Sequence, residues 1–84
     1  MSAPFDEGPG AALLGFNGEA VQYCQGISDM AAQEYARDYA RMLQNRAKGS
    51  DFSIPRRPYG LFEPNRNLIR SALERMSKKY FHPN

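Results

Sequence analysis

A proline-rich segment separates the two stretches of this sequence that have the periodicity of amphipathic helices. Pro55 and Pro58 lie inside this segment, and Pro64 lies just after it. Proline fixes its own φ, lacks an amide hydrogen and biases the preceding residue toward extended conformations. A helix therefore cannot continue through residues 50–63. We expect an extended strap there, with a turn at Gly60.

The stretch before the strap has the pattern of a helix over about residues 28–48. At about 100° per residue, its apolar residues fall on one face and most of its charged residues on the other. Ser28 is expected to cap the start, and Gly49 to follow the last turn. The apolar face consists of Ala31, Ala32, Tyr35, Ala36, Tyr39, Met42, Leu43 and Ala47. Because alanine is small, this face suits close contact with another backbone.

The stretch after the strap predicts a second amphipathic helix over about residues 64–80. Pro64 suits the first helical turn, where no amide hydrogen is needed, and Glu63 complements the positive end of the helix dipole. Lys78 and Lys79 complement the negative end. The apolar face consists of Leu68, Ile69, Ala72, Leu73, Met76 and Tyr80.

The N-terminal part of the chain is rich in glycine. Residues 1–26 contain five of the seven glycines, together with Pro4 and Pro9. Glycine at this density costs conformational entropy to order and disfavours both helix and strand. The larger apolar residues follow no clear period; they are Phe5, Leu13, Leu14, Phe16, Val21 and Tyr23. We therefore predict an extended arm over residues 1–26, with a short helical turn at residues 18–25 as the alternative.

The expected fold is mostly α, with two amphipathic helices joined by the strap and preceded by the arm. The 84 residues allow one small domain with a thin core. We assign the extended arm to residues 1–26 and a two-helix body to residues 27–84. Two helices bury only one stripe each against the other, so the strap and either the arm or another chain are expected to cover the rest.

Charge is divided unevenly along the chain. Residues 1–36 contain five acidic residues and no lysine or arginine, which gives −5. Residues 37–84 contain eleven basic and four acidic residues, which gives +7. Two arrangements bring these unlike charges together. Either the arm of one copy contacts the strap or second helix of the next copy, or the arm folds back on the second helix of its own chain.

The residue types that catalysis needs do not occur in a recognisable arrangement. Cys24 is the single cysteine and His82 the single histidine, so the sequence excludes an intramolecular disulfide and the usual zinc sites. No basic residue or histidine lies near Cys24 in sequence to lower its pKa, and we expect a buried or inert thiol. Neither a phosphate-binding loop nor a dinucleotide-binding glycine motif is present. We therefore predict a protein that is not an enzyme and uses no cofactor or metal.

Two features concern the location of the protein. No apolar run approaches the roughly 18 residues that a membrane-spanning helix needs, so no membrane span is expected. The N-terminus has Asp6 and Glu7 where a secretory signal has Lys or Arg. We expect a cytoplasmic or virion protein.

Aromatic residues and arginines in the arm, the first helix and the strap favour a protein-binding function. Arginine and tyrosine are enriched at the residues that contribute most to protein interfaces. We predict a non-enzymatic structural or adaptor subunit of a larger protein assembly, with a phage virion component as one concrete candidate and copies of the chain itself among its protein partners. The predicted contact residues are Phe5, Leu14, Phe16, Tyr35, Tyr39, Arg56, Arg57, Tyr59 and Phe62.

The alternative is a small basic nucleic-acid-binding protein, or a regulatory protein or inhibitor that covers a partner's active surface. Arginine side chains suit phosphate groups, and aromatic rings stack on bases. The candidate residues are Arg56, Arg57, Arg66, Arg70, Arg75, Lys78 and Lys79, with Tyr59 and Phe62 among them. Because these basic residues are spread around the second helix and the acidic arm opposes the same polyanion, the sequence favours the protein-binding function.

Overall fold

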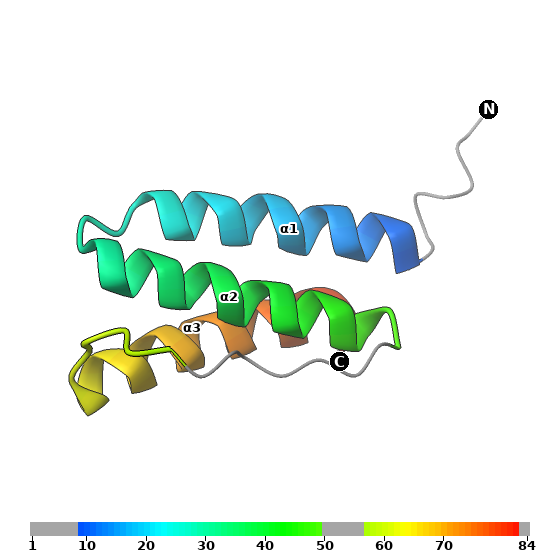
Figure 1. Ribbon diagram of the computed structural model, residues 1–84. Helices are drawn as coiled ribbons and strands as arrows, with labels where there is room; N and C mark the ends of the chain where they lie inside the picture. The colour runs from blue at the N-terminus through cyan, green and yellow to red at the C-terminus, as the bar shows by residue number, and fades with distance from the viewer. Residues whose placement is uncertain (1–8, 50–56, 83–84) are drawn as a thin grey trace.

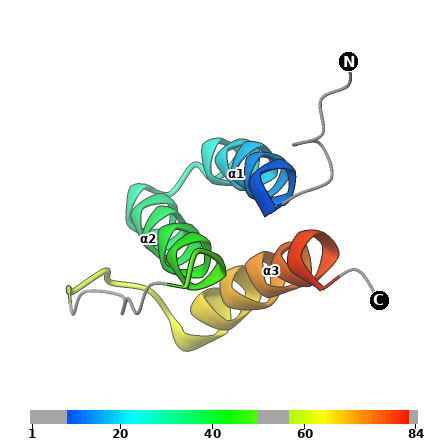
Figure 2. The same cartoon turned by 90° about the vertical axis from the view of Figure 1, so that its right-hand side faces the viewer.

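The structure, a computed structural model, describes residues 9–49 and 57–82 of the chain. These residues form three α-helices and no strand: α1 (Pro9–Gln25), α2 (Met30–Ala47) and α3 (Glu63–Phe81). The prediction of a mostly α fold is confirmed. Seen along the bundle, the three helices lie at the corners of a triangle (Figure 2), and each helix packs against the other two.

The order of the helices in the bundle depends on two connections of different length. Helices α1 and α2 run in opposite directions and are joined by the short turn at residues 26–29, whereas α2 and α3 run in the same direction (Figure 1). Two parallel helices need a connection as long as the first helix, which is about 27 Å for the 18 residues of α2. The chain between Ala47 and Glu63 is long enough to span this distance when extended.

Helix α1 lies where the sequence predicts an extended arm, so that prediction is corrected for Pro9–Gln25. The helix begins at a proline, which is favourable in a first turn. Its stripe of buried residues consists of Phe16, Ala20 and Cys24, four positions apart and each at most 5% exposed. This period is visible only when alanine and cysteine are counted as apolar residues. Residues 1–8 of the predicted arm lie outside the described residues.

Gly15 allows α1 to lie directly against α3. A Cβ atom built on Gly15 would lie 2.5 Å from Cε1 of Tyr80, which is closer than van der Waals contact permits. Cβ atoms built on Gly10 or Gly18 would meet nothing within 4 Å. One glycine of α1 therefore has a packing role, whereas the two others face open space.

The ends of α2 follow local sequence signals. Asp29, rather than the predicted Ser28, caps the start, and its carboxylate accepts hydrogen bonds from the amides of Ala31 at 3.0 Å and Ala32 at 3.5 Å. Aspartate and serine are similarly good caps, and the aspartate adds negative charge at the positive end of the helix dipole. After the last turn, Gly49 has a φ of 91°, as predicted from its position.

The start of α3 also agrees with the sequence. Of the predicted strap, residues 50–56 lie outside the described residues and residues 57–62 form no helix. Gly60 has a φ of 72°, a backbone conformation that glycine adopts without steric cost. Helix α3 begins at Glu63, and Pro64 lies in its first turn.

The core lies between the three helices, so the predicted two-helix body is corrected to a three-helix bundle. Phe16 of α1 and Leu73 of α3 are the largest side chains that are fully buried. The ring of Phe16 also packs 5.3 Å, centroid to centroid, from the ring of Phe81 at the end of α3. Helix α1 thus covers the apolar surface that two helices leave open. The buried apolar residues are Phe16, Ala20, Cys24, Ala32, Tyr35, Ala36, Tyr39, Met42, Leu43, Tyr59, Ile69 and Leu73.

Candidate functional site

The structure buries four of the nine predicted contact residues. Phe16 lies in α1, Tyr35 and Tyr39 lie in α2, and Tyr59 lies in the segment before α3; each is at most 8% exposed. All four rings belong to the core of the chain itself. This burial leaves them little surface for contact with a partner.

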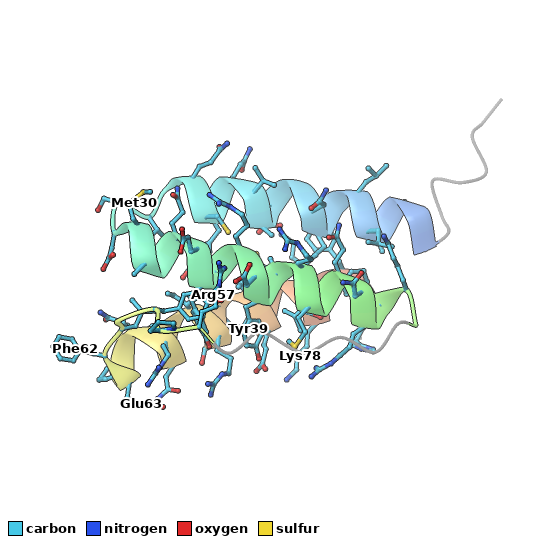
Figure 3. The ribbon with its side chains drawn as sticks, in the orientation of Figure 1. Met30, Tyr39, Arg57, Phe62, Glu63 and Lys78 are labelled. Carbon is cyan, nitrogen blue, oxygen red and sulfur yellow. The ribbon has the colours of Figure 1, made fainter. Side chains whose placement is uncertain are left out.

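Three other predicted contact residues are accessible. Leu14 is 71% exposed, Phe62 is 78% exposed, and the side chain of Arg57 is 45% exposed. Phe62 points away from the bundle at the start of α3 (Figure 3). The remaining two, Phe5 and Arg56, lie outside the described residues.

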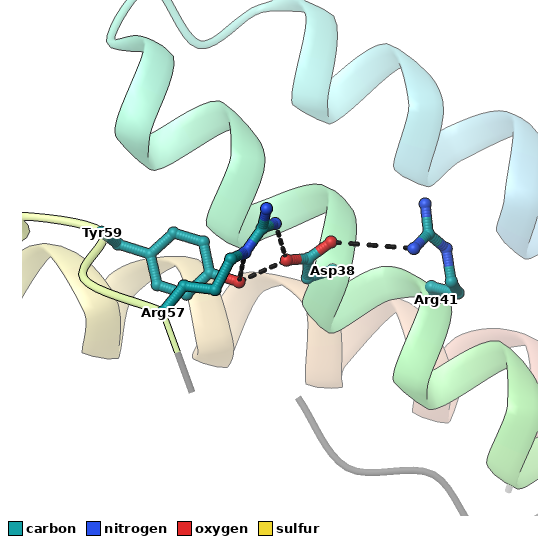
Figure 4. Close-up of polar contacts among 4 residues, drawn as sticks. All are labelled: Asp38, Arg41, Arg57 and Tyr59. Atoms are coloured by element: carbon teal, nitrogen blue, oxygen red, sulfur yellow. Dashed lines mark hydrogen bonds and ion pairs between the residues drawn. The ribbon is translucent and has the colours of Figure 1, made fainter. Parts of the chain in front are cut away.

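A buried carboxylate joins α2 to the segment before α3 (Figure 4). Asp38 is buried, although the helix pattern places it on the solvent-facing side. Its Oδ2 atom accepts hydrogen bonds from the Arg57 guanidinium and the Tyr59 hydroxyl. Arg57 Nε also donates to the Tyr59 hydroxyl at 3.2 Å, and Arg41 Nη1 lies 3.8 Å from Asp38 Oδ1.

These contacts determine the charge of Asp38. Burial by itself would raise the pKa of the carboxyl group, but the hydrogen bonds from Tyr59 and Arg57 outweigh it and hold the pKa of Asp38 below its ordinary value. A general acid needs a pKa near the working pH, so this carboxylate is unsuited to that role at neutral pH. Its contacts instead attach residues 57–59 to α2 and thereby position the start of α3.

A row of tyrosine rings extends from this carboxylate toward α3. The ring of Tyr35 lies 5.2 Å from that of Tyr59 and 6.0 Å from that of Tyr39, measured between centroids. The Tyr39 hydroxyl donates a hydrogen bond to Glu74 Oε2 of α3 at 2.7 Å. Burial, together with this hydrogen bond and the charge of Glu74, raises the pKa of Tyr39 to about 12. The row therefore connects the segment before α3 with α2, and through Tyr39 with α3.

The single charged residue of α1 forms its contacts within the chain. Glu19 Oε1 accepts hydrogen bonds from Lys79 Nζ at 3.1 Å and from the Tyr80 hydroxyl. An acidic residue of the N-terminal part thus meets a basic residue of α3 in the same chain. Of the two arrangements that the division of charge predicts, this contact is the one in which the chain folds back on itself.

Because Glu19 faces α3, the exposed side of α1 has no charged residue. Its exposed residues fall within an arc of about 140° at 100° per residue. This surface, termed the outer face of α1, consists of Gly10, Leu14, Asn17, Gly18, Val21, Gln22 and Gln25. Val21 is 46% exposed and Leu14 more so. In a chain with 24% charged residues, a helix face without charge is atypical of a fully solvated surface.

Leu14 of this face is one of the predicted contact residues and Val21 is not, because an extended arm does not bring the two side chains onto one face. The signal that identifies the outer face is the spacing of uncharged residues, and it has meaning only once residues 9–25 are known to be helical. Other large apolar side chains are also exposed, namely Met30 and Leu68 together with Phe62. Met30 and Phe62 lie at the end of the bundle where α2 and α3 begin (Figure 3).

The single thiol is buried, as predicted. Burial raises the pKa of Cys24, although the nearby charge of Arg37 acts in the opposite direction. Among residues 9–49 and 57–82, no three histidine, cysteine, aspartate or glutamate side chains form a group that could hold a metal ion. In the same part of the chain, no helix combines the length and the apolar character that crossing a membrane requires.

Comparisons with protein-family models, with curated proteins and with solved structures found no significant match to this chain. Any functional assignment therefore depends on the surfaces described above.

Proposed function

We propose that this chain is a non-enzymatic structural or adaptor subunit that binds a protein partner through the outer face of α1. The observation that supports this proposal is the exposure of Leu14 and Val21 on a helix face without charge. The centres of protein interfaces are depleted of charged residues in the same way. A copy of the chain itself is included among the partners that this face suits.

The shape of the outer face also suits contact with another helix. Gly10 and Gly18 have no side chain, and nothing within the described residues lies within 4 Å of a Cβ atom built on either. A second backbone can therefore approach α1 closely between Leu14 and Val21. Association through this face would remove both apolar side chains from water, which favours binding by about 25 cal/mol per Å² of apolar area.

The experiment is affinity purification at native expression level, combined with sedimentation of the purified chain to detect self-association. We expect a co-purifying protein, or a second copy, to be retained by the wild-type chain and lost from the double variant Leu14→Lys/Val21→Lys. Leu68→Lys is the matched control, because Leu68 is similarly exposed but lies on α3. This control is expected to bind like the wild type, and all variants are expected to have the same thermal melting curve.

Two outcomes would contradict the proposal. The first is a chain that neither self-associates nor retains any protein partner. The second is an equal loss of binding in the Leu68→Lys control, since that result would assign the contact to a different surface or to charge alone.

The nucleic-acid alternative has less support from the described contacts. Three of its candidate residues already donate to carboxylates of the same chain: Arg57 to Asp38, Arg66 to Glu63 and Lys79 to Glu19. Paired arginines and lysines contribute less to the attraction of a polyanion. Tight binding of DNA or RNA with a steep dependence on salt would favour this alternative over the protein-binding function.

A further inference from the structure

A cleft of about 250 Å³ lies between α1 and α2. Helix α1 contributes five of its lining residues and α2 contributes four. A cavity of about 150 Å³ with apolar walls is large enough for benzene, so this cleft has room for one ring and an attached charged group. The lining residues are Asn17, Ala20, Val21, Cys24, Gln25, Arg37, Ala40, Arg41 and Gln44.

The cleft exists because small side chains face each other across the two helices. Ala20 and Cys24 of α1 are buried, and Ala40 lies opposite them on α2. The two helices are held in register near their connection by a hydrogen bond that Gln33 Nε2 donates to the backbone carbonyl of Cys24 at 3.1 Å. The floor of the cleft is therefore apolar and is formed by short side chains on rigid helices.

The sides of the cleft are positively charged. Arg37 and Arg41 are one helical turn apart on α2, and no lining residue is acidic. Arg37 forms no ion pair with a residue in the described part of the chain. Arg41 Nη1 lies 3.8 Å from Asp38 Oδ1. The other oxygen of Asp38, Oδ2, accepts hydrogen bonds from Arg57 and Tyr59. The guanidinium group of Arg37 is therefore available to a further anion, and that of Arg41, whose side chain is 56% exposed, adds positive charge one turn away.

Side-chain amides complete the polar lining. Asn17 and Gln25 lie on the α1 side, and Gln44 lies on the α2 side next to the arginines. An amide offers both hydrogen-bond donors and an acceptor, so these three residues can bond the oxygens of an anion without adding charge. Two cations, three amides and an apolar floor form a combination that matches a small amphiphilic anion.

We propose that the α1–α2 cleft binds a small organic anion, in which a carboxylate or phosphate group contacts Arg37 and Arg41 and a single ring or short aliphatic group contacts Ala20, Val21 and Ala40. This proposal does not rest on the protein-binding function, although Asn17, Val21 and Gln25 line the cleft and also belong to the outer face of α1. The site belongs to the class of small, partly apolar pockets with a few converging polar groups.

The test is a nuclear magnetic resonance titration of the full chain with benzoate, phenyl phosphate and the neutral analogue benzamide. We expect the two anions to shift the amide signals of residues 17–25 and 37–44. Arg37→Gln/Arg41→Gln should weaken anion binding by about tenfold or more, because each guanidinium contributes a charge-assisted hydrogen bond. Arg46→Gln is the matched control, because Arg46 lies on the same helix but does not line the cleft.

The control should leave the affinity unchanged within about twofold, because Arg46 does not line the cleft and cannot bond the anion there. If the double variant does not fold, Arg37→Gln alone is used instead. Arg37 forms no ion pair within the described residues, so its replacement breaks no contact of that kind in the fold. Equal binding of benzamide, an equal loss in Arg46→Gln, signal shifts spread over α3, or no shift at millimolar anion would each overturn the proposal.

Discussion

At the scale of single residues, the fold sets the charge of two side chains in opposite ways. Asp38 is buried but accepts hydrogen bonds from two donors, and its pKa is lowered. Tyr39 is buried and donates to the carboxylate of Glu74, and its pKa is raised to about 12. In both cases the hydrogen-bond partner lies in a different part of the chain, so each charge state depends on correct packing.

The raised pKa of Tyr39 predicts a loss of stability in alkali. Because the folded-state pKa lies above the ordinary value of 10.0, the contribution of the neutral phenol is fully present below pH 10 and decreases as the pH rises toward about 12. Tyr39→Phe should make the decrease smaller without abolishing it, because the pKa values of Tyr23, Tyr59 and Tyr80 are also raised. Tyrosinate absorbance followed against pH, together with denaturant unfolding below and above pH 10, measures the effect.

Glu74→Gln is the matched variant for this titration. It keeps a hydrogen-bond acceptor for Tyr39 but removes the negative charge, so the pKa of Tyr39 should fall while remaining above 10.0, because burial is the larger cause of the shift. A Tyr39 that titrates near 10.0 in the folded wild-type chain would contradict the buried hydrogen bond to Glu74.

At the scale of elements, α1 shows how one helix tolerates several glycines. Only Gly15 lies against another side chain, whereas Gly10 and Gly18 face open space. Glycine lowers helix stability because it leaves the unfolded chain more freedom. Helix α1 would therefore not be stable by itself, and it is stabilised by the tertiary contacts of Phe16 and Glu19 with α3.

Replacing a glycine of each kind by alanine should change the free energy of unfolding in opposite directions. Gly18→Ala should raise the free energy of unfolding by about 0.5–1 kcal/mol, because the new methyl group meets nothing and the helix gains propensity. Gly15→Ala should lower it by about 1–3 kcal/mol, because the methyl group would lie 2.5 Å from the ring of Tyr80. Denaturant unfolding of both variants measures the two changes. If Gly15→Ala stabilises the chain as Gly18→Ala does, α1 does not lie this close to α3.

At the scale of the whole molecule, the bundle needs all three helices to enclose its core. Phe16 is 1% exposed and contributes the largest buried side chain of α1, packing at the end of α3. A chain of 84 residues has little surplus stability, so the loss of one such side chain affects the entire fold.

Phe16→Ala and Leu14→Ala form a matched pair that tests this dependence. Phe16→Ala should lower the free energy of unfolding by about 3–5 kcal/mol, since it leaves a cavity in the core. Leu14→Ala, only two positions away but exposed, should change it by less than about 0.5 kcal/mol. Both are measured by urea unfolding. Equal effects would indicate that α1 does not pack on α2 and α3.

The sequence by itself determined the elements whose signals are local. The boundaries of α2 and α3 follow from Gly49, Pro64 and the apolar period, because caps, prolines and amphipathic faces act within one or two turns of the chain. The capping residue is Asp29 and not the predicted Ser28, and each end of α2 and α3 lies within two residues of its predicted position.

The conformation of residues 9–25, the burial of Asp38 and the cleft beside Arg37 depend on how the helices pack against one another. Helix α1 contains three glycines, which lower its intrinsic helix propensity, and it becomes stable by docking, which no local pattern reports. The donors of Asp38 lie 19 and 21 residues further along the chain, so its burial depends on the path of the segment before α3. The outer face of α1 and the cleft exist for the same reason, since both depend on how the helices pack.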